Sequence, residues 1–433
     1  MKTFFIQNFG CRATQADGAA LEGLLGGAGL QPAGARQQAD LVILNTCSVT
    51  ASADEDVRKS IHRVHRENPH ARILVTGCYA QRAPEELAEI PGVTWVVGNS
   101  HKTLIPEVVA APYHGQILVG DIAKATEFLS APVEDAFGDR TRPNLKIQEG
   151  CNNLCSFCII PALRGRSRSM PADEVVGRVR FLAQKYSEVV LTGINLGRWG
   201  REAGFSPAGG ERLAGLLRRL LDETPVGLLR LSSVEPMDLS DDLLRLMADE
   251  GRIARHIHAP LQSGSDTVLR RMKRRYRRRH YEDRILRAHA LMPDAAFGAD
   301  VMTGFPGETD AEFRETFDFV RQLPLTYLHV FTYSERPGTP AAAAADPVTE
   351  RVRKERTRVL RELGAMKNLE FRKRMEGRVL KAVTLENGTA LTTNYIKVSL
   401  ATPRPANRLI ELVMGPPRGD GIAEASPFPV LSF

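Results

Sequence analysis

The sequence lacks any long apolar run. Among its 433 residues, no stretch approaches the roughly 20 consecutive apolar residues that a membrane-spanning helix needs. Its first residues, MKTFFIQNFGCRATQ, have neither the apolar core nor the small-residue cleavage site of a signal peptide. We therefore expect no membrane partner and a cytoplasmic location. With 43% hydrophobic and 25% charged residues, the composition is that of an ordinary globular chain.

Cysteine is scarce, and none follows Cys158. Disulfides are rare in cytosolic proteins, so we do not expect the cysteines to pair. Cysteines that only fill space in a core would not be expected to stop a third of the way along the chain. Their distribution indicates metal ligands, at Cys11, Cys47, Cys78, Cys151, Cys155 and Cys158.

Three patterns divide the chain. Residues 1–115 alternate strand-like and helix-like segments, which predicts a parallel-sheet α/β domain, and residues 116–140 have the weak periodicity of a linker. Residues 141–368 repeat the alternation at a larger scale, which predicts a partial or full βα barrel. After a long charged helix, residues 371–433 contain short strands with an Asn-Gly turn signal, which predicts a small all-β module. The predicted fold class is therefore α/β with a C-terminal β domain.

A compact cysteine motif opens the barrel region. Cys151, Cys155 and Cys158 have C-x3-C-x2-C spacing. Three thiolates can hold three irons of a cubane, whereas a fourth would close the cluster and make it an electron carrier. The open iron can bind the amino and carboxylate groups of S-adenosylmethionine, which makes these cysteines the predicted catalytic residues. A zinc site is the alternative, but zinc closes at four ligands and no second cysteine pair lies nearby.

The other three cysteines each follow a predicted strand. Cys11, Cys47 and Cys78 are about one βα unit apart. The carboxyl ends of parallel strands share one edge of a sheet, so the three thiols are expected to converge there. Grouped thiolates suit soft metals and iron–sulfur clusters, and three ligands again leave one iron open, here for a sulfur species. The alternative is three small buried apolar side chains.

Both triads together resemble the radical S-adenosylmethionine methylthiotransferases. The segments Asn8–Cys11, Asn45–Cys47 and Thr76–Cys78 are similar to the three cysteine motifs of that family, and Pro260–Ser265 and Arg270–Arg274 to its downstream signatures. The resemblance covers essentially the whole chain. It implies a partial radical SAM barrel, a C-terminal TRAM barrel, two [4Fe-4S] clusters and S-adenosyl-L-methionine. A 5′-deoxyadenosyl radical would abstract hydrogen from an inert C–H bond, with an electron donor such as flavodoxin or ferredoxin.

The resemblance also implies contacts for S-adenosylmethionine. Phe157 occupies the position that lies against the adenine, and Leu191–Gly193 resembles the glycine motif that binds the methionine amino group. A second strand end resembles the ribose contact, and the segment Gly298–Glu308 resembles the strand that meets the adenine. The residues expected to bind the cofactor are Phe157, Thr192, Gly193, Ser232, Glu235 and Thr303.

Three branches of the family differ in substrate. Local sequence around Cys11 and Cys47 resembles the branch that acts on N6-threonylcarbamoyladenosine at position 37 of tRNA, where the methylthio group enters at adenine C2. The branches for isopentenyladenosine tRNA and for a ribosomal-protein aspartate remain alternatives, as do a radical methyltransferase and a non-catalytic iron–sulfur RNA-binding protein. The chain departs from its branch at Thr14, which is commonly Asn, and at Ala16-Asp17, commonly Tyr-Glu.

The charge balance is basic, with a net charge of +7. Such a surface attracts polyanions, and the arginine-rich run 270–279 favours an RNA partner, expected to be the anticodon stem-loop. A solvated helix face is the alternative interpretation of that run. The expected RNA contacts are Arg274, Arg275, Arg378, Lys381 and Lys397.

Overall fold

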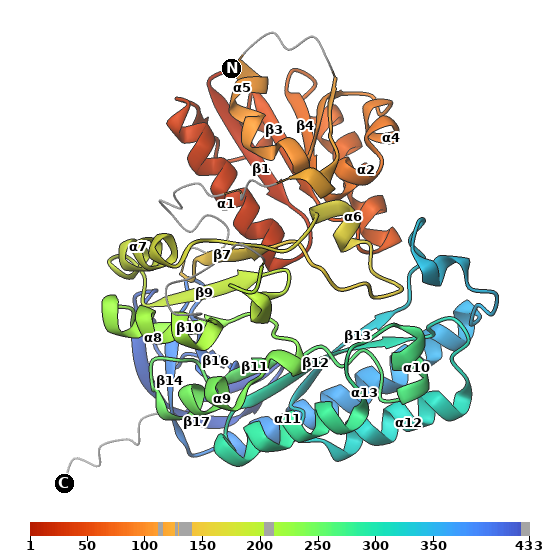
Figure 1. The fold of residues 1–433 in the computed structure, drawn as a ribbon. Helices are drawn as coiled ribbons and strands as arrows, with labels where there is room; N and C mark the ends of the chain where they lie inside the picture. The colour runs from red at the N-terminus through yellow and green to blue at the C-terminus, as the bar shows by residue number, and fades with distance from the viewer. Residues whose placement is uncertain (111–115, 126–128, 130–140, 203–211, 426–433) are drawn as a thin grey trace.

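The computed structural model describes residues 1–110, 116–125, 129, 141–202 and 212–425, so most of the predicted linker lies outside the described residues. A parallel sheet, an open barrel and a closed β-barrel follow one another along the chain (Figure 1). The predicted fold class is therefore confirmed. Within the described residues, no helix combines the length and apolar character needed to cross a membrane.

The N-terminal sheet is parallel throughout, in the order β2-β1-β3-β4-β5-β6. Its strands are β1 (Thr3–Asn8), β2 (Gln31–Pro32), β3 (Leu41–Thr46), β4 (Arg72–Gly77), β5 (Val93–Gly98) and β6 (Ile117–Leu118). Its helices are α1 (Arg12–Gly27), α2 (Ala51–Glu67), α3 (Cys78–Arg82), α4 (Pro84–Ala88) and α5 (Ile105–Ala110), with short turns η1 (Arg36–Gln38), η2 (Asn99–Leu104) and η3 (Ile122–Lys124).

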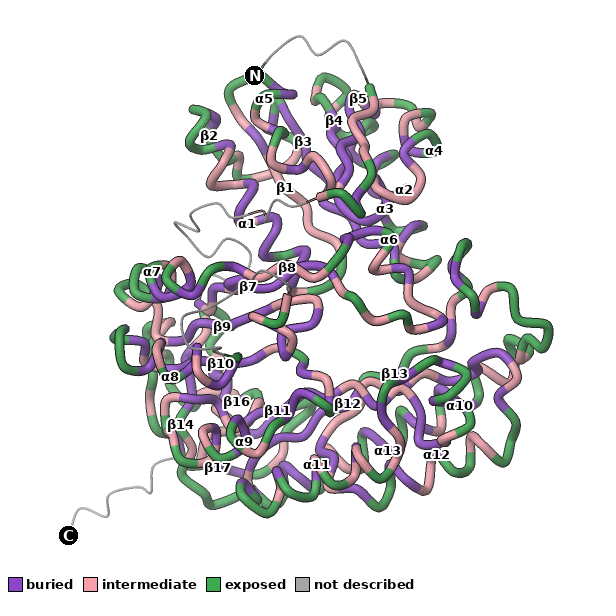
Figure 2. Tube along the Cα trace, in the orientation of Figure 1, coloured by how far each residue is buried: buried purple, intermediate pink, exposed green. Residues whose placement is uncertain are grey.

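The central strand β3 is buried at every position because helices cover both faces of the sheet (Figure 2). Val42 and Leu44 pack into the cluster under α2, whereas Leu41 and Ile43 pack into the cluster under α1 and α5. This is the near-continuous apolar run that doubly covered parallel strands require. It fixes the carboxyl ends of β1, β3 and β4 along one edge.

The central region is an open barrel made of two sheets, in the orders β10-β9-β7-β8 and β11-β12-β13. A bridge between Leu229 and Ile253 joins them. The strands are β7 (Asn144–Glu149), β8 (Arg168–Ser169), β9 (Glu188–Gly193), β10 (Leu228–Leu231), β11 (His256–His258), β12 (Ala296–Thr303) and β13 (Tyr327–Thr332). All pair in parallel except the short β8, as crossover helices demand.

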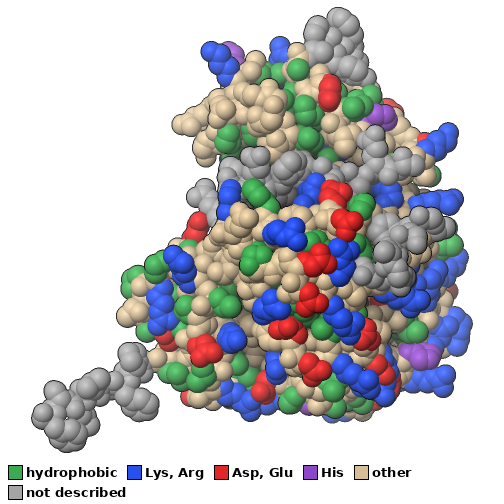
Figure 3. All heavy atoms as spheres, turned by 60° about the vertical axis from the view of Figure 1, so that its left-hand side comes forward, with side chains coloured by type: hydrophobic (Ala, Val, Ile, Leu, Met, Phe, Trp, Pro, Cys, Tyr) green, Lys and Arg blue, Asp and Glu red, His purple; other side chains and the backbone are tan. Residues whose placement is uncertain are grey.

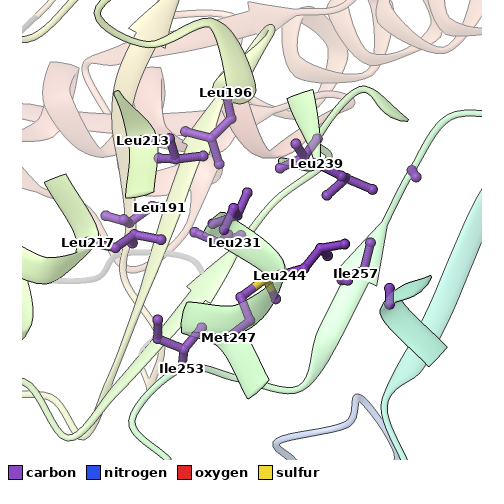
Figure 4. Close-up of a cluster of buried hydrophobic side chains, with 14 of the residues drawn as sticks. Leu191, Leu196, Leu213, Leu217, Leu231, Leu239, Leu244, Met247, Ile253 and Ile257 are labelled. Carbon is purple, nitrogen blue, oxygen red and sulfur yellow. The ribbon is translucent and has the colours of Figure 1, made fainter. Parts of the chain in front are cut away.

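Helices cover the outer face of this barrel, as Figure 4 shows where α8 and α9 meet β9, β10 and β11 through Leu217, Met247, Leu191, Leu231 and Ile257. The helices are α6 (Ile160–Arg164), α7 (Ala172–Ala183), α8 (Leu213–Glu223), α9 (Asp241–Asp249), α10 (Asp266–Arg271), α11 (Arg278–Leu291), α12 (Asp310–Gln322) and α13 (Glu350–Met375). Short turns are η4 (Leu196–Arg198), η5 (Pro236–Asp238) and η6 (Pro340–Ala343).

The C-terminal module is a closed barrel in the order β14-β15-β16-β18-β17. Its strands are β14 (Val379–Thr384), β15 (Thr389–Thr392), β16 (Lys397–Ser399), β17 (Leu409–Arg418) and β18 (Gly421–Glu424). Phe371 and Met375, at the end of α13, pack into its core. The helix therefore runs through the boundary predicted at residues 368–371 and ties the barrel to the module.

The turn Thr392–Ile396 of the C-terminal module docks on the central open barrel. Arg230 of β10 donates to the carbonyl oxygens of Thr393 at 3.1 Å and Thr392 at 3.0 Å. The ring of Tyr395 stacks on His256 of β11, with centroids 4.3 Å apart. This turn thus covers one end of the barrel's inner face.

Candidate functional site

The motif C-x3-C-x2-C follows β7 on a loop that only glycine can begin. Gly150 has a φ of +69°, and a Cβ there would lie 2.1 Å from the carbonyl oxygen of Arg166. Cys151 Sγ accepts hydrogen bonds from the Asn153 backbone N–H at 3.4 Å and from Asn195 Nδ2 at 3.7 Å. Arg274 donates to Cys155 Sγ at 3.3 Å. Donors aimed at sulfur are what cluster-bound thiolates need.

Burial raises the pKa of the Cys151 thiol, and it raises that of Cys158 to about 12, with the nearby Cys155 and Cys151 thiols adding to the shift. The spacing C-x3-C-x2-C keeps the three thiols on one short loop. Cysteine binds iron as the thiolate and not as the thiol, so metal binding must displace the protons of these three thiols. A set of three soft ligands, with donors already in place, fits a cubane that has one open iron.

Arg274 was expected to contact RNA, and the structure corrects this. Its side chain is only 5% exposed and forms an ion pair with Glu235, while it also donates to Cys155. The neighbouring Arg275 is exposed. Alternation along the chain turns Arg274 inward, because Met272 and Tyr276 on either side are buried as well. Arg274 is therefore a partner of the cysteine loop and not a phosphate ligand.

An apolar pocket of about 220 Å³ adjoins Cys158. Phe157, Met302 and Phe331 line it from the barrel, and Val49 and Thr50 line it from the loop after Cys47. Phe157 also packs against Met302 beside Phe305 and Tyr333. The pocket therefore lies where both cysteine regions meet, and its apolar walls suit a flat base.

Thr303 was expected to meet the adenine, but its side chain faces away from this pocket. It is 1% exposed, and its hydroxyl lies 2.7 Å from that of Thr357 on α13. Strand alternation explains the difference, because Met302, one residue earlier, takes the inner face. Met302, and not Thr303, therefore lines the pocket.

The other predicted cofactor residues lie at the ends of β9 and β10. Thr192 is buried, and a Cβ at Gly193 would lie 2.9 Å from Gln148. Ser232 Oγ is buried without a hydrogen-bond partner among the described residues, which marks a polar atom able to meet a ligand. Glu235 is held by Arg274. Sequence reasoning missed Asn195, whose backbone N–H donates to Gln148 Oε1 at 2.6 Å.

Two glycines allow the close approach of the strand ends that carry the N-terminal triad. Gly10 has a φ of +98°, and a Cβ there would lie 2.6 Å from the Cβ of Cys47. Gly77 has a φ of +97°, and its Cβ would lie 2.4 Å from the carbonyl oxygen of Thr46. Cys11 caps α1, and Cys78 begins α3. Burial, with the Cys78 and Cys11 thiols nearby, raises the pKa of Cys47 to about 12.

The segments that carry the two triads meet at the domain interface, where Figure 1 shows α6 between the N-terminal sheet and the barrel. Cys78 packs against Ile159 and Leu163 of the second cysteine loop. Asn99 donates from Nδ2 to Cys78 Sγ at 3.7 Å and to the carbonyl oxygen of Leu163 at 2.9 Å. One side chain thus bridges the surroundings of both triads.

A buried group of five charges supports this interface: Asp17, Lys102, Lys146, Glu149 and Arg164. Asp17 lies 3.0 Å from Lys102 Nζ and 3.1 Å from Arg164, and also pairs with Lys146. Burial would raise the pKa of Asp17, but Lys102, Lys146 and Arg164 hold it well below its usual range. The group is therefore charged and ties α1 to β7 and α6.

The departures near Cys11 are accommodated by these contacts. The hydroxyl of Thr14 lies 3.6 Å from Cys11 Sγ and accepts from Arg164 at 3.5 Å. Ala16 is buried in α1. Asp17, where the branch commonly has Glu, provides the carboxylate that pairs with the three buried cations. The sequence near Cys11 differs from that of the branch, but Cys11 still lies at the start of α1, which these contacts hold in place.

The remaining predicted RNA contacts lie near the surface. Lys381 is exposed, Arg378 forms an ion pair with Asp294, and Lys397 lies 3.8 Å from Asp420. On the face drawn in Figure 3, basic and acidic side chains are interspersed. Partial neutralisation by such pairs leaves a moderate attraction for phosphates.

A further group, which sequence reasoning missed, lies on the inner face of the second sheet. His258 Nε2 is 2.9 Å from Asp300 Oδ1, and His329 Nδ1 is 3.4 Å from the same oxygen. Ligand-capable atoms of the three residues lie within 4.8 Å of one another. In the sequence these residues are visible only as polar positions within three separate strands. The pairing of the strands was needed to show that the three side chains meet.

Comparison with known proteins agrees with this geometry. Residues 145–320 match the Radical SAM superfamily, and residues 3–98 match the family described as Uncharacterized protein family UPF0004. The radical S-adenosylmethionine methyltransferase TsrM from Kitasatospora setae shares the fold, with a TM-score of 0.59, 16% identity, and coverage of 79% of this chain and 75% of that chain. The cysteine loop on an open βα barrel thus defines a radical SAM protein, which implies S-adenosylmethionine and a [4Fe-4S] cluster.

Relatives over the whole chain narrow this class. Threonylcarbamoyladenosine tRNA methylthiotransferase MtaB of Aquifex aeolicus is 36% identical over 418 residues, covering 96% of this chain and 100% of that protein. MtaB of Bacillus subtilis is 38% identical, covering 92% and 90%. The tRNA-2-methylthio-N(6)-dimethylallyladenosine synthase of Carboxydothermus hydrogenoformans is 33% identical, covering 87% of each. The chain belongs to the radical SAM tRNA methylthiotransferases of the MtaB family, and the family prediction is confirmed.

Proposed function

We propose that this protein inserts a methylthio group at adenine C2 of N6-threonylcarbamoyladenosine at position 37 of tRNA. The observation that carries the proposal is the meeting of two cysteine triads at one interface, bridged by Asn99. One triad suits radical generation, and the other suits the holding of sulfur. The MtaB relatives support the choice of substrate.

The proposal includes a second [4Fe-4S] cluster on Cys11, Cys47 and Cys78. Gly10 and Gly77, both with positive φ, allow the strand ends that carry these cysteines to approach closely. Three ligands leave one iron accessible to a sulfur species. Cys11 is the exposed member, so the site opens on that side.

When bound, the clusters and S-adenosylmethionine supply the one-electron chemistry that an inert aromatic C–H bond requires. The chain positions these groups. Asn195 and Arg274 hold the sulfur atoms of the Cys151–Cys158 loop, and Ser232 offers a hydroxyl toward the cofactor. Phe157 and its pocket neighbours keep water from the reacting base. Thr192, Gly193 and Glu235 remain proposed cofactor contacts.

The partners of this reaction are the anticodon stem-loop of tRNA and a low-potential electron donor such as flavodoxin or ferredoxin, in the cytoplasm. Arg275, Lys381 and Lys397 are exposed cations able to meet phosphates. Such contacts fix the register of an RNA without reading its sequence. Discrimination between tRNAs must therefore come from the modified base.

Mass spectrometry of tRNA nucleosides tests the function. A strain that lacks this protein should accumulate threonylcarbamoyladenosine without its methylthio group, and the wild-type chain should restore the modification. The triple variant C11A/C47A/C78A should still form 5′-deoxyadenosine from S-adenosylmethionine but transfer no methylthio group. Its iron content should fall from about eight to about four per chain, since each cubane holds four irons.

Three outcomes would contradict the proposal. A wild-type protein with about four irons and full activity would indicate a radical methyltransferase that uses only the second triad. If no 5′-deoxyadenosine forms anaerobically with a reductant, the protein is an iron–sulfur RNA-binding protein. Methylthiolation of isopentenyladenosine alone would move the chain to the other tRNA branch.

A further inference from the structure

His258, Asp300 and His329 face the interior of the barrel. They lie on β11, β12 and β13, where Asp300 pairs in register with His329. Their strand neighbours pack outward into the apolar cluster beneath the helices, so strict alternation turns the three polar side chains inward. Those outward neighbours are Ile257, Ala299, Val301 and Val330.

The group is ordered from one side and open on the other. Tyr327 OH lies 2.9 Å from His258 Nδ1, which aims His258 Nε2 at Asp300. Asp300 Oδ1 in turn lies 3.4 Å from His329 Nδ1. The His258 side chain is 8% exposed and that of His329 is 53% exposed. His329 is therefore the member that can meet a ligand, with its ring orientation set by Asp300.

The position along the strands relates this group to the reaction site. Two residues beyond Asp300 and His329 are Met302 and Phe331, which line the apolar pocket beside Cys158. Two strand residues span roughly 6.6 Å. The polar group thus lies one layer deeper than the pocket. At the far end of this face, Tyr395 stacks on His256 and receives a hydrogen bond from Arg12 at 3.3 Å.

We propose that His329, positioned by Asp300 and His258, binds the threonyl carboxylate of the substrate and selects against an isopentenyl group. This inference rests on the proposed function. A threonylcarbamoyl substituent on N6 carries a carboxylate and a hydroxyl. Because His329 Nδ1 faces Asp300, the carboxylate accepts from Nε2–H of the doubly protonated ring, and the hydroxyl can donate to Nε2 of the neutral ring. An isopentenyl group offers no acceptor and would strip water from the half-buried histidine and carboxylate. A polar group that loses its water without gaining a hydrogen-bond partner is unfavourable, so the layer favours a polar substituent.

The test uses reconstituted full-length protein and synthetic anticodon stem-loops that carry either threonylcarbamoyladenosine or isopentenyladenosine. Product formation is followed by mass spectrometry at matched iron content. His329→Phe keeps an aromatic ring without N–H groups and should raise KM for the threonylcarbamoyl stem-loop at least tenfold, with a smaller change in kcat. His329→Gln, which keeps an N–H donor, should recover part of that loss. His62→Phe, on the exposed face of α2, serves as the matched control and should leave both constants unchanged.

The outcomes separate this inference from the function on which it rests. Wild-type protein that methylthiolates neither stem-loop defeats the proposed function itself. Wild-type protein that is active, together with a His329→Phe variant whose KM equals that of the control, overturns only the role of His329. A stoichiometric divalent metal other than iron, present in the wild type and lost from His329→Phe, would also overturn it, because the three residues would then be metal ligands.

Discussion

Replacing Asp17 with asparagine would leave a surplus of buried positive charge at the interface between the two cysteine triads. Asp17 is 1% exposed and pairs with Lys102, Lys146 and Arg164, so with Glu149 the five charges sum to +1. The variant raises that sum to +2 among side chains that are almost fully buried. Breaking a buried ion pair by removing one partner costs about 3–5 kcal/mol. We expect a loss of that size in the free energy of unfolding.

Urea denaturation of the metal-free protein, followed by circular dichroism, measures this loss. The matched control is Glu350→Gln, because Glu350 pairs with Lys354 at 2.6 Å on the exposed surface of α13. Such a pair contributes less than about 0.5 kcal/mol. Adding Lys102→Met to Asp17→Asn returns the charge of the group to +1, so the double variant should be more stable than the sum of the two single losses predicts. An Asp17→Asn variant no less stable than the control, or strictly additive losses, would refute the reasoning.

Three further predictions concern the cysteine loops and α1. Arg274→Lys keeps a charge but cannot serve Cys155 and Glu235 together, so 5′-deoxyadenosine formation at matched iron content should fall roughly tenfold, and an unchanged rate would contradict the role. Gly10→Ala forces a Cβ to 2.6 Å from that of Cys47, so iron analysis should show about four fewer irons per chain, whereas Gly26→Ala, which meets no atom, should lose none. Burial raises the pKa of Glu22 from 4.5 to about 8, so the carboxyl destabilises the folded state increasingly as pH rises from about 4.5 to about 8. Glu22→Gln should therefore raise the melting temperature near pH 8 but not near pH 4. Equal gains at both pH values would contradict this.

The proposed cluster ligands could be named from the sequence because iron–sulfur chemistry restricts the residue type. Cys11, Cys47 and Cys78 follow buried strands, and parallel pairing was enough to expect them at one edge. The helix over residues 350–375 was predictable from its charge pattern and is α13 as observed. In each case the information lies within one segment, or in the general geometry of parallel sheets.

The partners of those ligands were not predictable in the same way. Arg274 lies in a basic run whose other arginines are indistinguishable from it by type, and only the fold shows that it faces Cys155. Thr303 and Met302 differ by one position, so their roles depend on a register that sequence does not fix. His258, Asp300 and His329 come from three strands and meet only once the sheet is paired. α1 begins at Arg12 because Gly10, with its positive φ, turns the chain directly into the helix.

The docking of Tyr395 on the barrel has a consequence for how RNA is processed. With its ring stacked on His256 and the adjoining carbonyl groups held by Arg230, that turn obstructs one end of the inner face. A polynucleotide cannot thread through an obstructed passage, so we expect a single nucleotide of the tRNA to flip out and to enter from the side of the cysteine loops. Unstacking a base costs a few kcal/mol, and contacts inside the barrel must offset it. The methylthiolated base then leaves by the route through which it entered, so loop restacking and product release are one event.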